Sequence, residues 1–477
     1  MKHYLLAFPL LAFIGCAPDS TDNASAENEV NNTVILNGTL ANHTGGLVKL
    51  YNPEGEVADS AELSEQGDFA LQFEVEEPGY YRFKYKEYAT LYLNGGDSLH
   101  MTLDMAEFDE SLTFSGRGAG PSQYIIARLL LEEGMSSNLR ELLALEVEEF
   151  ITKTDSTRLA YDQHLEQYTK DYPNLDADFL FMEQARNVYD WAYNRQLYPQ
   201  YHARFAQKES YEAPADYFTF AEELNLEDER YLKLGSYNKY VTALVEKAAQ
   251  DKYADNEEFQ AQDHWQLHAQ FEMVPTVVTN QTIREKFLFD MLHNQIRYQG
   301  IENLQALVDA YHAQSQDAEN KATIDKVYGE WQALVAGNEA PDFEAVDTEG
   351  NAVKLSDLRG KYVYIDAWAT WCGPCKAEIP HLEKLQEEFT GKNITFVSVS
   401  IDDTKEPWDE WMAEKEMGGT QLFVDGAWKS PFARAYLIRS IPRFLLIDPQ
   451  GKIIDSNAER PSGDIAKVLA ELEGIEA

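Results

Sequence analysis

Alternating apolar and polar residues run in short stretches through residues 33–114, the period of two expected of half-buried strands. The strand-like stretches are residues 34–36, 47–51, 69–73 and 80–85. Turn residues separate them at 52–55, 67–68 and 95–97. The pattern predicts an antiparallel β sandwich or barrel, and we expect this β domain to span residues 33–115.

A helical period follows the β domain. One apolar stripe consists of Leu139, Leu142, Leu143, Val147, Phe150 and Ile151, and a second of Ile324, Val327, Tyr328, Trp331, Leu334 and Val335. Segments 179–198 and 287–298 are rich in aromatic residues, which at helical spacing usually form a core. We predict a helical domain at 122–336.

Two motifs of these regions are weak signals of a ligand site. The glycine-rich run 116–121 lacks the Lys-Ser/Thr of a phosphate loop, so it predicts a junction between domains. His264 and His268 are four residues apart, as zinc ligands on a helix can be. No metalloprotease glutamate lies between them and no cysteine is nearby, so we expect a solvated helix face and no metal.

Strands and helices alternate in residues 337–477, which predicts an α/β sheet. The strand-like runs are 362–368, 394–401, 422–424, 443–447 and 452–455, and helical patterns cover 376–389 and begin again at 463. The chain of 477 residues is therefore expected to be multi-domain, with a β domain, a helical domain and a C-terminal α/β domain.

Charge excludes one class of function. The 40 Lys and Arg residues face 82 Asp and Glu residues, for a formal net charge of −42. A chain this acidic repels phosphate backbones and has no cationic excess with which to release counterions. Nucleic-acid binding is therefore not expected.

The N-terminal pattern is typical of an export signal. A basic start precedes the apolar stretch 4–14, which is too short to cross a bilayer, and Gly15 and Cys16 follow. Residues 13–16 resemble a bacterial lipobox, which implies a signal peptide at 1–15 and lipidation of Cys16. Polar residues up to 32 then predict a flexible tether at 16–32. A plain cleaved signal with an incidental cysteine is the alternative.

The remaining cysteines, Cys372 and Cys375, form a CxxC motif at the expected start of a helix. Zinc needs four ligands and the chain offers no further cysteines, so redox chemistry is favoured. Two cysteines at i and i+3 can form a disulfide, and the helix N-terminus stabilises a thiolate. We expect Cys372 to be the exposed nucleophile and Cys375 the shielded resolving thiol. An inert structural bridge is the alternative.

The surrounding residues carry a specific resemblance. Residues 366–375, Asp-Ala-Trp-Ala-Thr-Trp-Cys-Gly-Pro-Cys, resemble thioredoxin, and residues 375–380 are similar to the membrane-tethered TlpA/ResA branch of that family. The resemblance covers about residues 337–472 and includes the motif residues Trp371, Gly373 and Pro374. The β domain resembles, by general pattern, the one that precedes the redox domain in bacterial lipoproteins of this kind.

The resemblance implies roles for residues outside the cysteine pair. Asp366 matches the buried aspartate that moves protons for the resolving thiol, and Glu378 matches a glutamate that tunes the cysteines. A solvated helix carboxylate is the alternative for Glu378. Ile441 and Pro442 match the cis-proline loop, which faces the CxxC motif and pairs with the substrate backbone. Arg443 then either biases the choice of substrate or faces solvent.

The resemblance implies a thiol-disulfide oxidoreductase that reduces disulfides of protein substrates and needs no cofactor besides the cysteine pair. It further implies a lipid-anchored, periplasm-facing protein of a Gram-negative cell envelope, with a membrane electron donor of the CcdA/DsbD type and a link to cytochrome c biogenesis. A disulfide isomerase, with the N-terminal regions as platform, and a non-enzymatic binding lipoprotein are alternatives. A peroxidase is disfavoured because Ile365 and Ala369 stand where peroxiredoxins have Pro and Thr.

Overall fold

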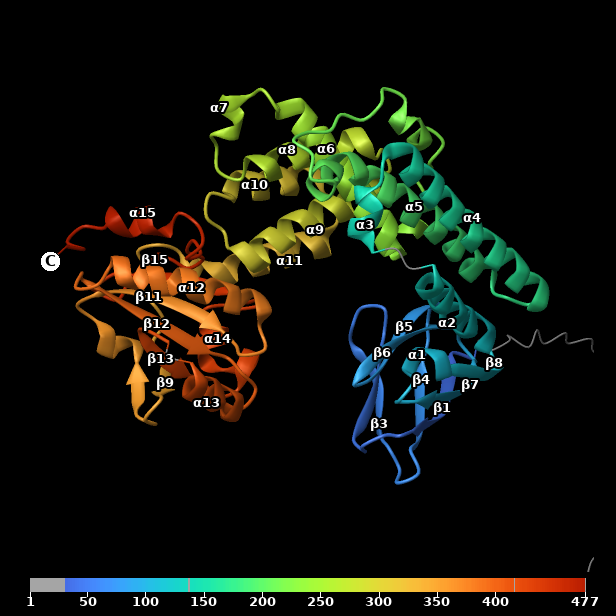
Figure 1. Cartoon of the computed structure of the whole chain (residues 1–477), viewed down its shortest axis with the longest axis horizontal. Helices are drawn as coiled ribbons and strands as arrows, with labels where there is room; N and C mark the ends of the chain where they lie inside the picture. The colour runs from blue at the N-terminus through green and yellow to red at the C-terminus, as the bar shows by residue number, and fades with distance from the viewer. Residues whose placement is uncertain (1–30, 136–137, 416, 477) are drawn as a thin grey trace, which may run out of the picture. The chain divides into compact units, whose positions relative to one another are not determined.

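The structure is a computed structural model, and it describes residues 31–135, 138–415 and 417–476 (Figure 1). The chain divides into two compact units: residues up to 142 with 155–187, and residues 143–154 with 188–477. The expected signal peptide at 1–15, Cys16 and nearly all of the expected tether lie outside the described residues. The boundaries expected at 33–115, 122–336 and 337–477 stay predictions.

Two four-stranded sheets form the N-terminal part of the first unit (Figure 1, blue). Their strands are β1 (Thr33–Ala41), β2 (Leu47–Tyr51), β3 (Val57–Glu62), β4 (Asp68–Glu74), β5 (Gly79–Tyr85), β6 (Glu87–Leu93), β7 (Ser98–Asp104) and β8 (Thr113–Arg117). The sheet orders are β4-β1-β7-β8 and β3-β2-β5-β6. The expected β domain is confirmed with one exception, since β1 pairs with β7 in parallel. Five strands lie between them along the chain and pass through both sheets, so the chain can return in the same direction.

A close approach explains the glycine-rich run that ends the β domain. Gly118 has a left-handed backbone, φ 87°, and precedes α2 (Ala119–Gly134). A Cβ at this position would lie 2.0 Å from a carboxylate oxygen of Asp97. The run therefore makes the turn from β8 into α2, which only glycine can adopt here.

Helix α2 and parts of α4 (Val147–Asp171) and α5 (Ala177–Phe205) complete the first unit. Aromatic side chains join them to β5 and β6, where Tyr92 contacts Tyr80 and Phe179 with ring centroids 5.2 and 5.0 Å apart. A buried charge lies among them, because the Glu183 carboxylate accepts a hydrogen bond of 2.6 Å from Tyr80 and faces Arg128 at 3.8 Å. This unit is therefore held by apolar packing around one buried carboxylate that has a hydroxyl donor and an arginine nearby.

The predicted helical middle region is confirmed. Besides α4 and α5, its helices are α3 (Leu139–Ala144), α6 (Gly235–Tyr253), α7 (Glu257–Gln260), α8 (Trp265–Val277), α9 (Gln281–Gln299), α10 (Gln305–Gln314) and α11 (Ala318–Trp331). The apolar stripe that starts at Leu139 does not form one helix, since α3 ends at Ala144 and α4 begins at Val147. His264 lies before α8 and bonds the Glu302 carbonyl at 2.8 Å, so the two histidines do not share a helix face.

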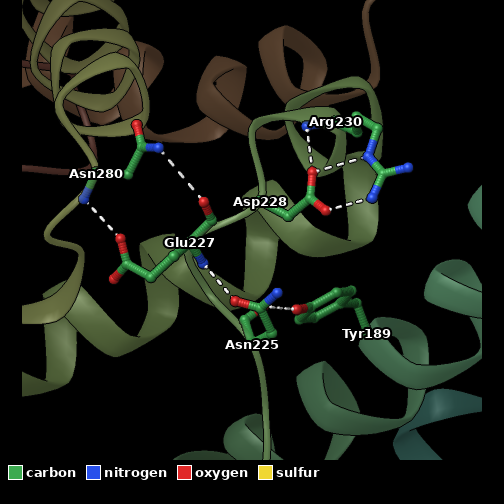
Figure 2. Close-up of polar contacts among 6 residues, drawn as sticks. All are labelled: Tyr189, Asn225, Glu227, Asp228, Arg230 and Asn280. Carbon is green, nitrogen blue, oxygen red and sulfur yellow. Dashed lines mark hydrogen bonds and ion pairs between the residues drawn. The ribbon is translucent and has the colours of Figure 1, made fainter.

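The long connection between α5 and α6 contains two short 3-10 helices, Tyr217–Ala221 and Glu229–Lys233. Polar contacts also hold it in place (Figure 2). The Glu227 carboxylate accepts hydrogen bonds from the backbone N–H groups of Thr279 (2.9 Å) and Asn280 (2.6 Å). Tyr189, on α5, donates to the Asn225 carbonyl. Backbone N–H groups at the start of a helix have no partner within the helix and lie at the positive end of its dipole. A carboxylate that accepts hydrogen bonds there is favourable, so Glu227 stabilises the start of α9.

A seven-stranded mixed sheet forms the C-terminal domain (Figure 1, orange to red). Its strands are β9 (Glu344–Asp347), β10 (Ala352–Lys354), β11 (Tyr362–Trp368), β12 (Ile394–Ser400), β13 (Thr420–Phe423), β14 (Arg443–Ile447) and β15 (Ile453–Asp455), in the order β10-β9-β13-β12-β11-β14-β15. Its helices are α12 (Gly373–Glu388), α13 (Lys405–Glu414), α14 (Pro431–Ala435) and α15 (Ile465–Ala470). The expected α/β fold is confirmed, and β11 is an interior strand, between β12 and β14, that is wholly buried.

Candidate functional site

The CxxC motif lies between the end of β11 and the start of α12, where the chain leaves the sheet. Cys372 is the N-cap residue of α12, and its Sγ accepts a hydrogen bond of 3.1 Å from the Cys375 backbone N–H. The two cysteines form a disulfide. When the bond is reduced, the same N–H and the positive end of the 16-residue helix favour a thiolate on Cys372.

The expectation that Cys372 is exposed is wrong for this disulfide form. Cys372 is 4% exposed and Cys375 2% exposed. Each sulfur covers part of the other, and the N-cap position turns the Cys372 side chain over the first helical turn. The neighbours Gly373 and Pro374 are exposed, so the motif itself reaches the surface.

Two exposed tryptophans flank the disulfide. Trp371 is 55% exposed, and its ring centroid lies 6.2 Å from that of Trp428, which is also exposed. Trp428 precedes α14 and carried no signal in the sequence, because it lies 57 positions after Trp371. Together the rings offer an apolar surface beside the cysteines on which a polypeptide can pack.

Asp366 lies on β11 and is 4% exposed. The pKa of this carboxyl is raised to about 8, first by burial and second by the negative charge of Glu378, while the neighbouring Ser398 hydroxyl opposes the rise. A carboxyl with that pKa is mostly protonated at neutral pH. This pKa is also close to that of an ordinary thiol, so transfer of a proton between Asp366 and a cysteine costs little free energy.

Glu378 lies one turn after Cys375 on α12 and is buried, so the alternative of a solvated carboxylate is wrong. Its oxygens accept hydrogen bonds from the Ser462 N–H (3.0 Å) and the Ser462 hydroxyl (2.9 Å). Its charge acts on Asp366, so the two carboxyl groups that the sequence singled out lie within electrostatic reach of each other.

Asp402 is a buried residue of the site that the sequence analysis missed. It accepts hydrogen bonds from the Thr370 N–H (3.0 Å), the Thr370 hydroxyl (2.8 Å) and the Ser400 hydroxyl (2.7 Å). These bonds hold the loop that leads into Cys372. Its place directly after β12 was a usable signal, because β11 and β12 are parallel and end at the same edge of the sheet.

The proline loop meets the end of β11. The Ile441–Pro442 peptide bond is cis, and β14 begins at Arg443. Arg443 pairs in register with Ala367, so one further step along the ladder sets Pro442 against Trp368, four residues before Cys372. The strand order therefore brings this loop and the CxxC loop to one edge of the sheet.

The expectation that the Arg443 side chain faces solvent is wrong, because the side chain is buried, and a bias in the choice of substrate stays a prediction. It is 5% exposed, and burial lowers its pKa to about 10, which leaves it charged at neutral pH. It donates to the carbonyl oxygens of Ser456 and Tyr298, and its guanidinium lies 5.1 Å from the centroid of the Trp331 ring. The sequence could not show this, because Tyr298 and Trp331 belong to the helical region.

The described residues contain no cluster of three or more His, Cys, Asp or Glu side chains able to hold a metal ion. Within the same ranges, no helix combines the length and the apolar character needed to cross a membrane.

Comparisons with known proteins agree on the C-terminal domain. Residues 336–456 match the AhpC/TSA family. The thiol-disulfide oxidoreductase ResA of Bacillus subtilis is 30% identical over 128 residues, which are 27% of this chain and 70% of that protein. Among solved structures, the thioredoxin domain of a thiol-disulfide oxidoreductase from Bacteroides vulgatus is 33% identical, with 29% of this chain and 96% of that chain covered and a TM-score of 0.27. A thiol:disulfide interchange protein from a Bacteroides species is 30% identical over 29% of this chain and 91% of its own, also with a TM-score of 0.27.

Proposed function

Because its C-terminal domain makes this chain a member of the ResA-like thiol-disulfide oxidoreductases, we propose that it reduces disulfides in other proteins. The observation that carries the proposal is the cysteine pair at the start of α12, with the Cys375 N–H directed at the Cys372 sulfur. Gly373 and Pro374, between the cysteines, form the dipeptide found in reducing members of the thioredoxin family.

The first step is attack by the Cys372 thiolate on one sulfur of a substrate disulfide. A bond forms between Cys372 and that sulfur, the substrate disulfide breaks, and the second substrate sulfur leaves as a thiolate that takes up a proton. The Cys375 N–H and the start of α12 stabilise the attacking thiolate. The exposed rings of Trp371 and Trp428 give the substrate chain a surface beside the attacked sulfur.

The second step is attack by the Cys375 thiolate on the Cys372 sulfur. It restores the enzyme disulfide and releases the substrate as a dithiol, so two electrons pass from enzyme to substrate. Cys375 must lose its proton while shielded from water. Asp366 is the proposed acceptor in its ionised form: burial and the charge of Glu378 raise its pKa to about 8, close to that of the thiol, so a fraction of the molecules has this carboxylate ready at neutral pH.

The enzyme must be reduced again after each cycle, and we assign that role to a membrane donor of the CcdA/DsbD type. Lipidation at Cys16 would hold the protein at the membrane of a Gram-negative envelope, facing the periplasm, where disulfide-bearing substrates occur. Support for this comes from the lipobox-like residues 13–16. A substrate connected with cytochrome c biogenesis fits a reductase in that compartment.

Trapping tests the proposed function directly. Cys375→Ser in the full chain should accumulate mixed disulfides through Cys372 in the native cell, and mass spectrometry would identify the trapped proteins. Cys372→Ser is the matched control and should trap nothing. If the purified wild-type protein rearranged scrambled disulfides faster than it reduced native ones, it would instead be an isomerase. If Cys375→Ser trapped no protein, the proposal would be wrong.

The anchor has its own test, because it lies at the opposite end of the sequence from the cysteine pair. Cys16→Ala should move the protein from the membrane fraction to the soluble fraction and leave insulin-disulfide reduction unchanged. Retention of the variant in washed membranes would disprove lipidation at Cys16 as the means of attachment.

A further inference from the structure

The C-terminal end of α9 contacts the proline loop of the redox domain. Three side chains of that domain donate to three successive carbonyls of the helix: Arg439 to Arg297 O (3.4 Å), Arg443 to Tyr298 O (2.8 Å) and Asn457 to Gln299 O (3.3 Å). The last carbonyls of a helix have no partner within the helix and lie at the negative end of its dipole. Two arginines and an amide there satisfy those acceptors, so the contact is chemically complementary.

The guanidinium of Arg443 is held by hydrogen bonds on two edges and by an aromatic ring on one face. Its Nε and Nη2 donate to the Ser456 carbonyl (3.0 and 2.6 Å), its Nη1 donates to Tyr298, and the guanidinium lies over Trp331. A planar guanidinium with donors on two edges and a ring on its face has one orientation available. The backbone of Arg443 follows Pro442 directly, so this orientation also limits the proline loop.

A second arginine fixes the loop from its other end. Arg439 donates to the Glu330 carboxylate at 2.7 Å as well as to the end of α9. Glu330 and Trp331 are the last two residues of α11. Residues 440–442 therefore lie between two arginines, and both arginines are bound to the ends of α9 and α11.

We propose that the ends of α9 and α11 position the proline loop for its protein substrate, with Arg439 and Arg443 as positioning residues. The helical region is then a working part of the redox site, one that determines how well a polypeptide is engaged beside Cys372. The proposal rests on the proposed function, because it assigns to residues 440–442 the contact with the substrate backbone. The thiol chemistry itself depends on α12, which these contacts leave untouched.

Two disulfide substrates separate positioning from chemistry. Insulin has a backbone that the loop can pair with, whereas the aromatic disulfide DTNB has none. Arg443→Gln and Trp331→Leu should lower the second-order rate of insulin reduction about tenfold, and should lower the DTNB rate less than about threefold. Arg443→Lys should give an intermediate insulin rate, because lysine keeps the charge but not the planar fork. Arg359→Gln is the matched control: this arginine of the same domain pairs with Glu339 at 3.0 Å and is exposed.

Equal losses with both substrates, or no loss with either, would overturn the positioning role. If a buried substitution impairs folding, Glu330→Gln provides a milder variant at the Arg439 contact, and circular dichroism checks each protein before the rates are compared. Glu330→Gln should lower the insulin rate in the same selective manner, by about threefold.

Hydrogen exchange gives a readout that does not depend on activity. In Trp331→Leu and Glu330→Gln, backbone amides of residues 439–446 should exchange several-fold faster, while those of α12 should keep their wild-type rates. If wild-type protein reduced neither disulfide, the proposed function would fail, and faster exchange in the loop would still show the positioning. Unchanged exchange in the loop would disprove the positioning whatever the activity.

Discussion

Two buried carboxyl groups, Glu183 in the first unit and Asp366 in the redox domain, have opposite surroundings. Glu183 accepts a hydrogen bond from Tyr80 and faces the guanidinium groups of Arg128 and Arg186 at 3.8 and 3.7 Å. Asp366 has no ion pair among the described residues, and its charged neighbour is another carboxylate, that of Glu378. One buried acid is neutralised by cations and the other is set against a like charge.

The difference shows which carboxyl group is part of the scaffold. A buried charge with cations and a hydroxyl donor is stable as it stands, and it joins α2, α5 and β5 within its unit. An acid that burial and a neighbouring carboxylate keep protonated destabilises the fold whenever it ionises, and such residues concentrate where a proton must move. Removing Glu183 should therefore cost stability, and removing Asp366 should cost rate.

The largest effect should come from the nucleophile, which tests whether chemistry is confined to the redox domain. Cys372→Ser should lower insulin-disulfide reduction at least about a thousandfold, because the hydroxyl is not ionised at neutral pH. Thermal unfolding of the first unit, followed by the near-ultraviolet signal of its tyrosines, should not change. Substantial reduction by the variant would show that the cysteine pair is not the catalytic group.

Breaking the buried pair of the first unit should give the next largest effect. Glu183→Gln leaves the Arg128 charge without its buried counter-charge and should lower the free energy of unfolding by about 3–5 kcal/mol. The matched control is Glu132→Gln, since Glu132 pairs with the same arginine at 3.5 Å but is 56% exposed, and it should cost less than about 1 kcal/mol. Urea unfolding measures both, and equal costs would contradict the scaffold role.

Removing the Asp366 carboxyl group should have the opposite effect on stability, and the size of this effect should depend on pH. Its pKa is raised from 3.8 to about 8 in the folded protein, so between these values the folded state binds the extra proton and wild-type stability falls as pH rises. Asp366→Asn removes that loss. The variant should therefore gain stability relative to the wild type as the pH rises from 4 to 8, as measured by urea unfolding of the disulfide form. Parallel pH profiles would mean that Asp366 is not protonated when folded.

The smallest effect is the kinetic one, and it depends on pH. Asp366→Asn should slow resolution of the mixed disulfide about tenfold near neutral pH and change the initial attack little. The deficit should shrink toward pH 9, where solution deprotonates Cys375 directly. Stopped-flow reduction across pH 6–9 separates the two steps, with Glu378→Gln measured in parallel. A larger deficit in that second variant would move the proton-accepting role to Glu378.

Much of the fold was predictable because its signals are local. Period-two stretches predicted β1, β2, β4 and β5, and the helical period predicted the middle region. The strands β3 and β6–β8 were missed. Polar residues hide the alternation in Val-Ala-Asp-Ser-Ala-Glu of β3, whereas β7, Ser-Leu-His-Met-Thr-Leu-Asp, alternates clearly and was overlooked. The cysteine pair and the buried aspartate were also predictable, because both lie within ten residues of one motif.

The sequence by itself determined the chemistry of this protein: a CxxC pair at a helix start, an aspartate in an apolar strand and a proline loop all have short-range signatures. Only the tertiary structure decided what surrounds them. Arg443 contacts Tyr298 across 145 positions and Glu378 contacts Ser462 across 84. Asp402, in the segment after β12, bonds Thr370 across 32 positions. Such partners depend on how the chain packs, because burial and hydrogen bonding are set by residues close in space, whatever their separation along the chain.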